Sequence, residues 1–254
     1  MLPACVLLLL AVIATPASSD LVVPNFPDLM VKTRTATADH HTLVTTWLFK
    51  GPRQRTEIQD PASSNRIGHP SIYQCDQGLR YLLNESSKTY NTMPIDPAEI
   101  RKTAHPMPQL EMSGGEVIVT IDSVDTGERR KIGSYEARHV RSTTTVEPGP
   151  GAVTRPSKTE TDGWYIDVPG RNCQDSSAPQ MGWLTAWSGR RDRVVFKTLG
   201  AAPHGLAIEE TSTKSEAGMS LVSKTELVEI SEQRLDQALF EPPPDYTPAP
   251  IAHK

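Results

Sequence analysis

Hydrophobic and polar residues alternate along many short segments of this chain, which is the pattern of β-strands with one face buried and the other exposed. The clearest case lies near residue 80, where Leu79, Tyr81 and Leu83 share one face. The chain turns on both sides of this segment, at Gly78 and at Asn84. Two or three short strands are therefore predicted over residues 71–95.

One predicted strand, residues 43–50, is apolar on both of its faces. Trp47 and Phe49 point to one side of it, and Val44 and Leu48 point to the other. A strand of this kind needs cover on both sides, from a helix, a second sheet or a ligand.

The rest of the chain continues the pattern and predicts a mainly β fold with minor α content. Alternation predicts further strands at residues 29–38, 53–59, 116–125, 137–146, 163–168, 193–199, 206–213 and 219–230. Short helices, two or three in all, are expected at residues 96–102, within 174–188 and at 231–239. The strands are closely spaced and do not alternate with helices, which favours an antiparallel sheet.

A single β-rich domain is predicted over residues 20–240. An irregular, proline-containing connector divides it into two possible halves, residues 20–105 and 116–240. The tail, residues 241–254, is proline-rich and can join a sheet only at an edge.

The first 19 residues have the pattern of a secretory signal peptide. Val6–Ala14 is an apolar run too short to span a bilayer, and small residues suited to cleavage follow it. No lysine or arginine precedes the run, which departs from the usual signal, and a buried first strand is the alternative. Cys5 comes before the run, so lipidation at this cysteine is not expected. No second run reaches spanning length, so the mature protein is expected in the periplasm and not integral to the membrane.

Charge is mixed along the chain, and the formal net charge is −4. This balance gives no electrostatic reason to expect nucleic acid or an anionic membrane as a partner. The charge runs 128–131 and 190–193 stand near predicted turns and are expected to be solvated hairpin tips.

Two cysteines remain after export, Cys75 and Cys173, 98 positions apart. Neither belongs to a C-x-x-C motif or stands near histidines spaced for zinc, which disfavours a reactive thiol or a metal ligand. A disulfide between them is predicted because the compartment is oxidising, and it contributes up to about 4–5 kcal/mol in the chain-entropy model. Two separately buried thiols are the alternative.

Motifs for catalysis are missing from the sequence, which has no G-x-S-x-G, H-E-x-x-H, P-loop or G-x-G-x-x-G pattern. Asp162, Asp167 and Asp175 flank an aromatic segment and offer an acid–base pair, but carboxylates beside a glycine turn usually cap it. His40 and His41 stand at a turn, where histidines are usually solvated. We therefore expect no enzyme activity, no cofactor and no metal.

Several motifs occur together over most of the mature chain. They are Tyr73-Gln74-Cys75-Asp76, Lys88-Thr89-Tyr90 with Met93-Pro94, Thr126–Arg130, Asp162–Asp167 and Leu235–Tyr246. In combination they resemble the LolA/LolB-like superfamily of periplasmic lipoprotein carriers and its uncharacterised exported relatives. The resemblance implies a curved antiparallel half-barrel whose concave face holds an acyl chain or a similar apolar ligand.

The sequence therefore predicts an exported periplasmic binding or carrier protein for an apolar or acylated ligand, such as a lipid or the acyl chain of a lipoprotein. Apolar side chains of the predicted strands are the candidates for lining its site. They are Trp47, Phe49, Leu83, Trp164 and Ile166. The alternative is an envelope sensor or assembly module that binds another protein, to which the proline-rich tail offers an extended docking segment.

Overall fold

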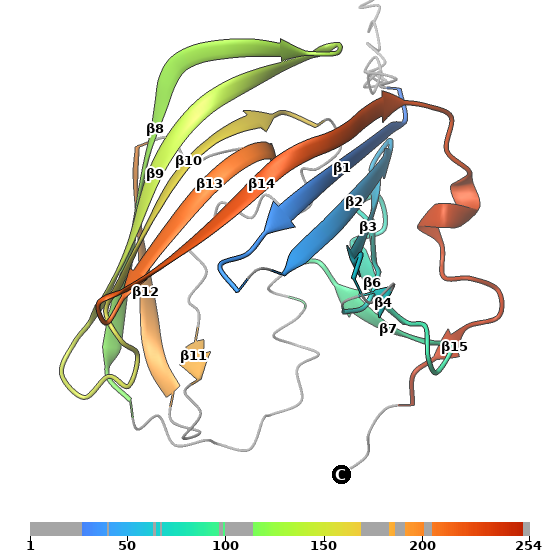
Figure 1. The fold of residues 1–254 in the computed structure, drawn as a ribbon. Coiled ribbons are helices and arrows are strands. Elements are labelled where there is room, and N and C mark those ends of the chain that lie inside the picture. The colour runs from blue at the N-terminus through green and yellow to red at the C-terminus, as the bar shows by residue number, and fades with distance from the viewer. Residues whose placement is uncertain are drawn as a thin grey trace, which may run out of the picture.

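A computed structural model shows one open, curved sheet that bends around an interior space (Figure 1). The structure describes residues 27–39, 41–62, 65–66, 68–96, 99, 114–168, 183–185, 191–200 and 205–250. The predicted signal peptide, His40, Cys173 and Asp175 lie outside the described residues. The predicted mainly β class is confirmed.

Fifteen strands of the described chain belong to the sheet. They are β1 (Leu29–Ala36), β2 (Thr42–Lys50), β3 (Arg53–Asp60), β4 (Asn65–Arg66), β5 (Ser71–Gln74), β6 (Leu79–Asn84), β7 (Thr89–Pro94), β8 (Glu116–Ile132), β9 (Tyr135–Pro148), β10 (Ser157–Ile166), β11 (Trp183–Thr185), β12 (Arg191–Gly200), β13 (Leu206–Glu216), β14 (Met219–Glu232) and β15 (Thr247–Pro248).

Most neighbouring strands are antiparallel, as predicted, but the sheet is mixed. The order is β11-β12-β8-β9-β10-β13-β14-β1-β2-β3-β5-β6-β7-β15, with β4 beside β3. β12 runs parallel to β8, and β15 runs parallel to β7. β14 pairs with β1, so one sheet joins the strands of both predicted halves. The expectation of a purely antiparallel sheet is therefore corrected.

The expected helices are largely replaced by extended chain. In the region predicted as helix 231–239, β14 continues to Glu232, and only a 3₁₀ turn, η2 (Gln237–Phe240), follows. Within 174–188, the described residues 183–185 form strand β11 beside β12. Of the helix expected at 96–102, Glu99 is helical, and most of its neighbours lie outside the described residues. The prediction of two or three short helices is wrong for the described chain.

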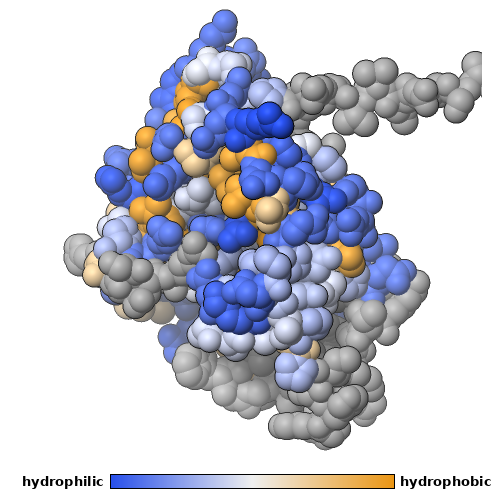
Figure 2. Space-filling view, turned by 90° about the vertical axis from the view of Figure 1, so that its right-hand side faces the viewer, coloured by the Kyte–Doolittle hydropathy of each residue, from blue (hydrophilic) through white to orange (hydrophobic). Residues whose placement is uncertain are grey.

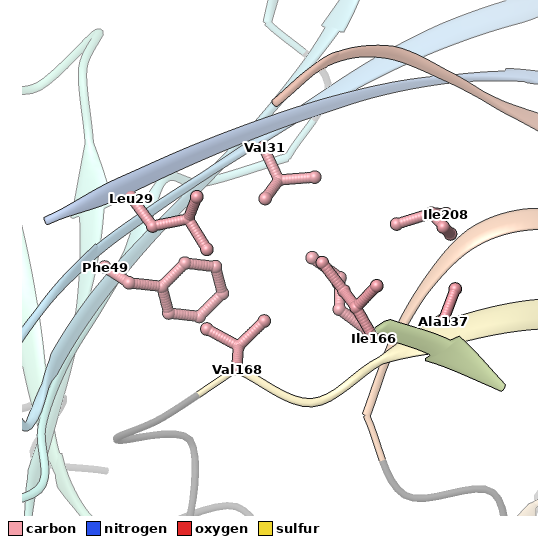
Figure 3. Packing of buried hydrophobic residues seen from close by; sticks show 8 residues of the cluster. Leu29, Val31, Phe49, Ala137, Ile166, Val168 and Ile208 are labelled. Atoms are coloured by element: carbon pink, nitrogen blue, oxygen red, sulfur yellow. The ribbon is translucent and has the colours of Figure 1, made fainter. Parts of the chain in front are cut away.

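An apolar cluster fills one end of the interior, between β1 and β2 on one side and the ends of β9, β10 and β13 on the other (Figure 3). Its buried members are Leu29, Val31, Phe49, Ala137, Ile166, Val168, Leu206 and Ile208. Residues far apart in the sequence therefore cover the inner face of β2, which the sequence predicted to need cover.

The outer face of β2 is covered by the chain that follows β14. Residues 233–248, the C-terminal strap, run over β3, β5, β6 and β7, and lie at the right of Figure 1. Leu235 and Phe240 from the strap are buried with Ile72 and Leu83, and Leu48 of β2 packs against this cluster. Both faces of the doubly apolar strand are thus covered by protein at its C-terminal end, around Phe49 and Leu48, whereas Val44 lines an open groove.

Polar groups on the same outer face fix the strap in place. The side-chain amide of Gln74 donates to the carbonyl of Phe240 at 2.8 Å, and the guanidinium of Arg55 donates to the carbonyl of Leu239 at 3.0 Å. Lys50 donates to the carboxylate of Asp28 at 2.6 Å. Burial opposes ionisation of Asp28, but the bond from Lys50 leaves its pKa below the ordinary value.

The described part of the proline-rich tail is packed on the sheet. Tyr246 packs against the outer cluster, and Thr247–Pro248 forms β15 at the edge of β7. The amide of Ala249 donates to the carbonyl of Tyr90 at 2.8 Å. This edge position agrees with the limit that proline sets, and it weakens the idea of a free docking tail.

The charge run 190–193 departs from the expectation of a solvated tip. Asp192, near the start of β12, is fully buried. It accepts hydrogen bonds from the backbone amides of Gly115, Val153 and Thr154 and from the hydroxyl of Thr154. The carboxylate thus ties three segments of the chain together.

Cys75 lies in the turn after β5 and is disulfide-bonded. Cys173 lies outside the described residues, so the pairing of these two cysteines stays a prediction. Cys75→Ser and Cys173→Ser are expected to lower the free energy of unfolding equally, each by about 2–4 kcal/mol, and the double variant no further. Urea unfolding of the three variants measures this, and additive losses would contradict the pairing.

Candidate functional site

An open groove of about 900 Å³ lies over the outer face of β1, β2 and β3, beyond the end of the strap. We call it the β1–β3 groove. Its lining residues are Lys32, Arg34, Thr42, Val44, Gln59, Asp60, Pro61, Ala62 and Val228.

Strand alternation sets which side chains reach the groove. Lys32 and Arg34 alternate along β1 with residues of the inner face, and one of these inner residues is Val31 of the apolar cluster. Arg34 pairs across the ladder with Val44 of β2, so these two side chains stand side by side. Alternation therefore places a cation next to an apolar surface.

A β-bulge in β14 adds the second valine. The register with β1 shifts between the pairs Lys32 with Glu229 and Thr33 with Leu227, so Val228 is the extra residue. Its side chain is 46% exposed and lines the groove. Without the bulge, the alternation of β14 would not bring this valine to the face that carries Lys32.

The far wall of the groove is a short turn after β3. The carboxylate of Asp60 accepts a hydrogen bond from the amide of Ala62 at 2.8 Å, which closes an Asx turn around Pro61. The turn fixes two small apolar residues opposite Val44 and Val228.

The charges around the groove are partly compensated by β14. Arg34 stands opposite Glu226 and Lys32 opposite Glu229 in the ladder. The bond from Lys224 at 2.8 Å, with a smaller contribution from Arg34, lowers the pKa of Glu226. The groove therefore presents an apolar floor with two cations and no strong net charge.

This arrangement is suited to binding and offers no evident catalytic group. Among the described residues, no three His, Cys, Asp or Glu side chains are grouped so as to hold a metal ion. None of the described residues that line the groove is a histidine or a cysteine. The expectation that the protein is not an enzyme stays a prediction.

The five ligand-lining candidates from the sequence fall into two separate places. Phe49 and Ile166 are buried in the inner cluster, and Trp47 and Trp164 pack against it. Leu83 is buried in the outer cluster beneath the strap, across the sheet from Phe49. Protein side chains surround all three of the fully buried candidates, and contact of any candidate with a ligand stays a prediction.

Trp164 is held by polar neighbours on β8, β9 and β13. The guanidinium of Arg130 lies 4.5 Å from the ring centroid, and the imidazole of His139 stacks on the indole at 4.9 Å. Arg130 also pairs with Glu209 at 2.9 Å. These contacts occupy the ring and give it a structural role beside the inner cluster.

Two of the three aspartates considered for acid–base chemistry, Asp162 and Asp167, bind cationic side chains and do not pair with each other. Asp162 bonds to His139 at 2.7 Å and to Arg141 at 2.8 Å, and the bond from His139 is the main cause of its lowered pKa. Asp167 pairs with Arg138 at 2.7 Å. Asp175 lies outside the described residues.

Sequence reasoning missed the groove itself. The outward valine of the doubly apolar strand, Val44, was recognised as needing cover, which is the one signal that pointed here. Val228 reads as an ordinary member of an alternating strand, because a bulge leaves no clear mark in the sequence.

The surface over the strap is not uniformly apolar. Figure 2 shows separate hydrophobic patches set among hydrophilic residues on the side of the molecule that lies at the right in Figure 1. The described part of the chain contains no helix with the length and hydropathy of a membrane span.

Comparison with known proteins gives one finding at the level of structure. No family model and no curated protein matches the chain. One similar solved structure is a domain from Vibrio parahaemolyticus, provisionally described as an outer membrane lipoprotein-sorting protein. The match covers 84% of this chain and 89% of that domain, with 6% sequence identity and a TM-score of 0.30. Its description matches the kind of protein that the sequence motifs resemble.

Proposed function

We propose that this protein is an exported, periplasmic binding or carrier protein for an apolar or acylated ligand, with the β1–β3 groove as its site. The observation that carries the proposal is the groove's combination of volume, apolar floor and adjacent cations. Its volume of about 900 Å³ lies within the usual range of ligand sites, which are mostly apolar with a few placed polar groups.

The lining defines the chemistry of the ligand. Val44, Val228 and the Pro61–Ala62 turn provide contact for an acyl chain. Lys32 and Arg34 are placed to bind an anionic group at one end of that chain. A fatty acid, a phospholipid or the acylated end of a lipoprotein meets both requirements.

Val44→Asp is expected to lower the affinity for an acyl chain at least tenfold, because a carboxylate would be desolvated against the ligand. The measurement is a titration of delipidated protein with a fluorescent fatty acid. Val124→Asp is the matched control, since Val124 is 58% exposed on β8 and does not line the groove. Equal affinities of the two variants would contradict the groove as the site.

A second pair of measurements separates the head group from the chain. Arg34→Gln is expected to lower the affinity for the fatty acid and to leave the affinity for an uncharged monoacylglycerol unchanged. Native mass spectrometry of protein purified from the periplasm, followed by organic extraction, then identifies the natural ligand. Protein that is consistently empty and does not bind either probe would overturn the proposed function.

The alternative function, an envelope sensor or assembly module that binds another protein, has one specific observation in its favour. Met219, Leu221 and Val222 at the β13–β14 hairpin are about half exposed or more, at 62%, 50% and 49%. Exposed apolar residues gathered at one tip are typical of a protein contact. A single stoichiometric protein crosslinked to this tip, in cells where the groove holds no lipid, would favour this alternative.

A further inference from the structure

Five hydroxyl side chains form an unbroken row across five neighbouring strands. Ser123 of β8 pairs with Ser142 of β9, which pairs with Thr161 of β10. Thr161 pairs with Ser212 of β13, and Ser212 pairs with Ser223 of β14. We call this set the hydroxyl row. It runs perpendicular to the strands, with neighbours separated by the strand spacing of about 4.8 Å.

The hydroxyl row lies on the face of the sheet that carries Thr225 of β14. Two residues along β14 from Ser223, Thr225 bonds to Thr35 of β1 at 2.9 Å. Thr35 shares a face of β1 with Val31, which belongs to the inner apolar cluster. The row is therefore on the side of the sheet opposite to the β1–β3 groove.

The other face of the same strands has a different composition. The residues adjacent to members of the row, which point to that face, are exposed and mostly charged. They are Asp122, Arg141, Asp162, Thr211 and Lys224. Solvation alone accounts for this face, whereas the face of the row carries neutral hydroxyls at all five positions.

One end of the row holds a polar atom without a partner. Ser123 is 1% exposed, and its hydroxyl has no hydrogen-bond partner among the described residues. A buried polar atom of this kind usually marks a place for a water or a ligand group. The four other hydroxyl residues are partly exposed, so the row is accessible along most of its length.

The other end of the row opens into a pocket of about 360 Å³. Ser212 and Ser223 line it, together with Thr37 and Ala38 after β1, and Leu221 and Val222 of β14 add an apolar surface. Lys214 and Asp39 also line the pocket, and Lys214 pairs with Glu216 at 2.6 Å. The pocket therefore sets apolar side chains beside the hydroxyls at this end of the row.

We propose that the hydroxyl row and this pocket bind a neutral, polyhydroxylated chain, that is, an oligosaccharide lying across the strands. Each serine or threonine hydroxyl can both donate and accept a hydrogen bond. A ligand that repeats donors and acceptors along its length, without charge, is complementary to such a row. A glycan has this chemistry, whereas an acyl chain would leave the five hydroxyls unpaired.

The site is independent of the proposed lipid function, because it uses the opposite face of the sheet and a ligand without an acyl chain. The probes are three soluble hexasaccharides, maltohexaose, cellohexaose and chitohexaose, added to the full mature protein. Methyl-labelled threonine gives an NMR reporter within the row, Thr161, and a reporter on the opposite face of the sheet, Thr143. At least one probe is expected to shift the Thr161 methyl signal and leave the Thr143 signal in place.

A pair of matched variants tests the hydroxyl itself. Thr161→Val keeps the shape of the side chain and removes the hydroxyl. It is expected to lower the affinity for the hexasaccharide about fivefold or more. Thr143→Val makes the same change on the other face of the sheet and is expected to bind like the wild type. Binding of none of the three probes, or equal weakening by both variants, would overturn the proposal. The fatty-acid titration reports on the groove whatever the outcome here.

Discussion

Phe240→Ala is expected to lower the free energy of unfolding by about 3–5 kcal/mol, the range found when a buried phenylalanine is truncated. Phe240 is completely buried and is the largest of the fully buried side chains among the described residues. It fills the outer cluster together with Ile72, Leu83 and Leu235. The loss therefore includes a cavity as well as the transferred surface.

The expected loss also reflects the position of Phe240 between two anchors. Its carbonyl accepts from the buried side chain of Gln74, and the neighbouring Glu241 pairs with Arg53. A strap loosened at Phe240 loses these bonds as well, since they depend on its path. Urea unfolding measures the change. Leu199→Ala is the control, because Leu199 is 52% exposed and its truncation is expected to cost less than about 0.5 kcal/mol.

A smaller loss, close to that of the control, would show that the strap is not needed to cover the outer face. The edge strand β15 would then be expected to detach readily, since only two residues pair it to β7. Proteolysis of the wild type and of Phe240→Ala after residue 232 distinguishes these cases. Faster cleavage of the variant alone supports the strap as an integral layer.

The sequence contained part of this result. The double apolarity of residues 43–50 predicted that both faces of that strand need cover, and protein provides it at Phe49 and Leu48 but leaves Val44 at an open groove. It did not predict which segments provide the cover, because the strap and the ends of β10 and β13 are distant in sequence. Alternation fixes the two faces of a strand but leaves its partners open.

A helix was predicted at 231–239, and the same packing explains why the chain is extended there instead. Leu235 and Phe240 are both buried on one flat sheet face, and an extended chain with a single 3₁₀ turn delivers both to it. Tertiary contacts here outweigh a modest helix propensity. The spacing of apolar residues correctly predicted that one side of this segment is buried. It was wrong to infer a helix from that spacing.

The candidate site was predictable only in its ingredients. Val44 was recognised, while its combination with Arg34 requires the register of β1 and β2, and Val228 requires the bulge in β14. The hydroxyl row was hidden for the same reason. Serine and threonine are common in strands, and only the registers across β8, β9, β10, β13 and β14 bring five of them into one line.

Asp192→Ala is expected to lower the free energy of unfolding by about 3–5 kcal/mol, because it leaves several buried donors without an acceptor. The carboxylate accepts from Gly115 at 3.0 Å, from Val153 at 3.0 Å and from the amide of Thr154 at 2.7 Å. The hydroxyl of Thr154 adds a fourth bond, at 2.6 Å. Asp192→Asn keeps one acceptor oxygen and is expected to lose less, about 2–3 kcal/mol.

The pH dependence gives an independent check on the same carboxylate. Burial alone would raise the pKa of Asp192, but the hydrogen bonds from Thr154, Val153 and Gly115 hold it below the ordinary value of 3.8. A lowered folded-state pKa contributes stability that is complete above the unfolded value and is lost as the pH falls through the folded value. The contribution of Asp192 is therefore expected to disappear below about pH 4.

Urea unfolding at pH 7 and at steps below pH 4 tests both parts. As the pH falls below about 4, the wild type is expected to lose stability more steeply than Asp192→Asn. The free energies of unfolding of the two proteins should therefore converge. Asp122→Asn is the control, since Asp122 is exposed on β8 and its replacement is expected to leave both the stability at pH 7 and the acid slope unchanged. An equal acid slope in the wild type and in Asp192→Asn would show that this carboxylate does not hold the three segments together through its charge.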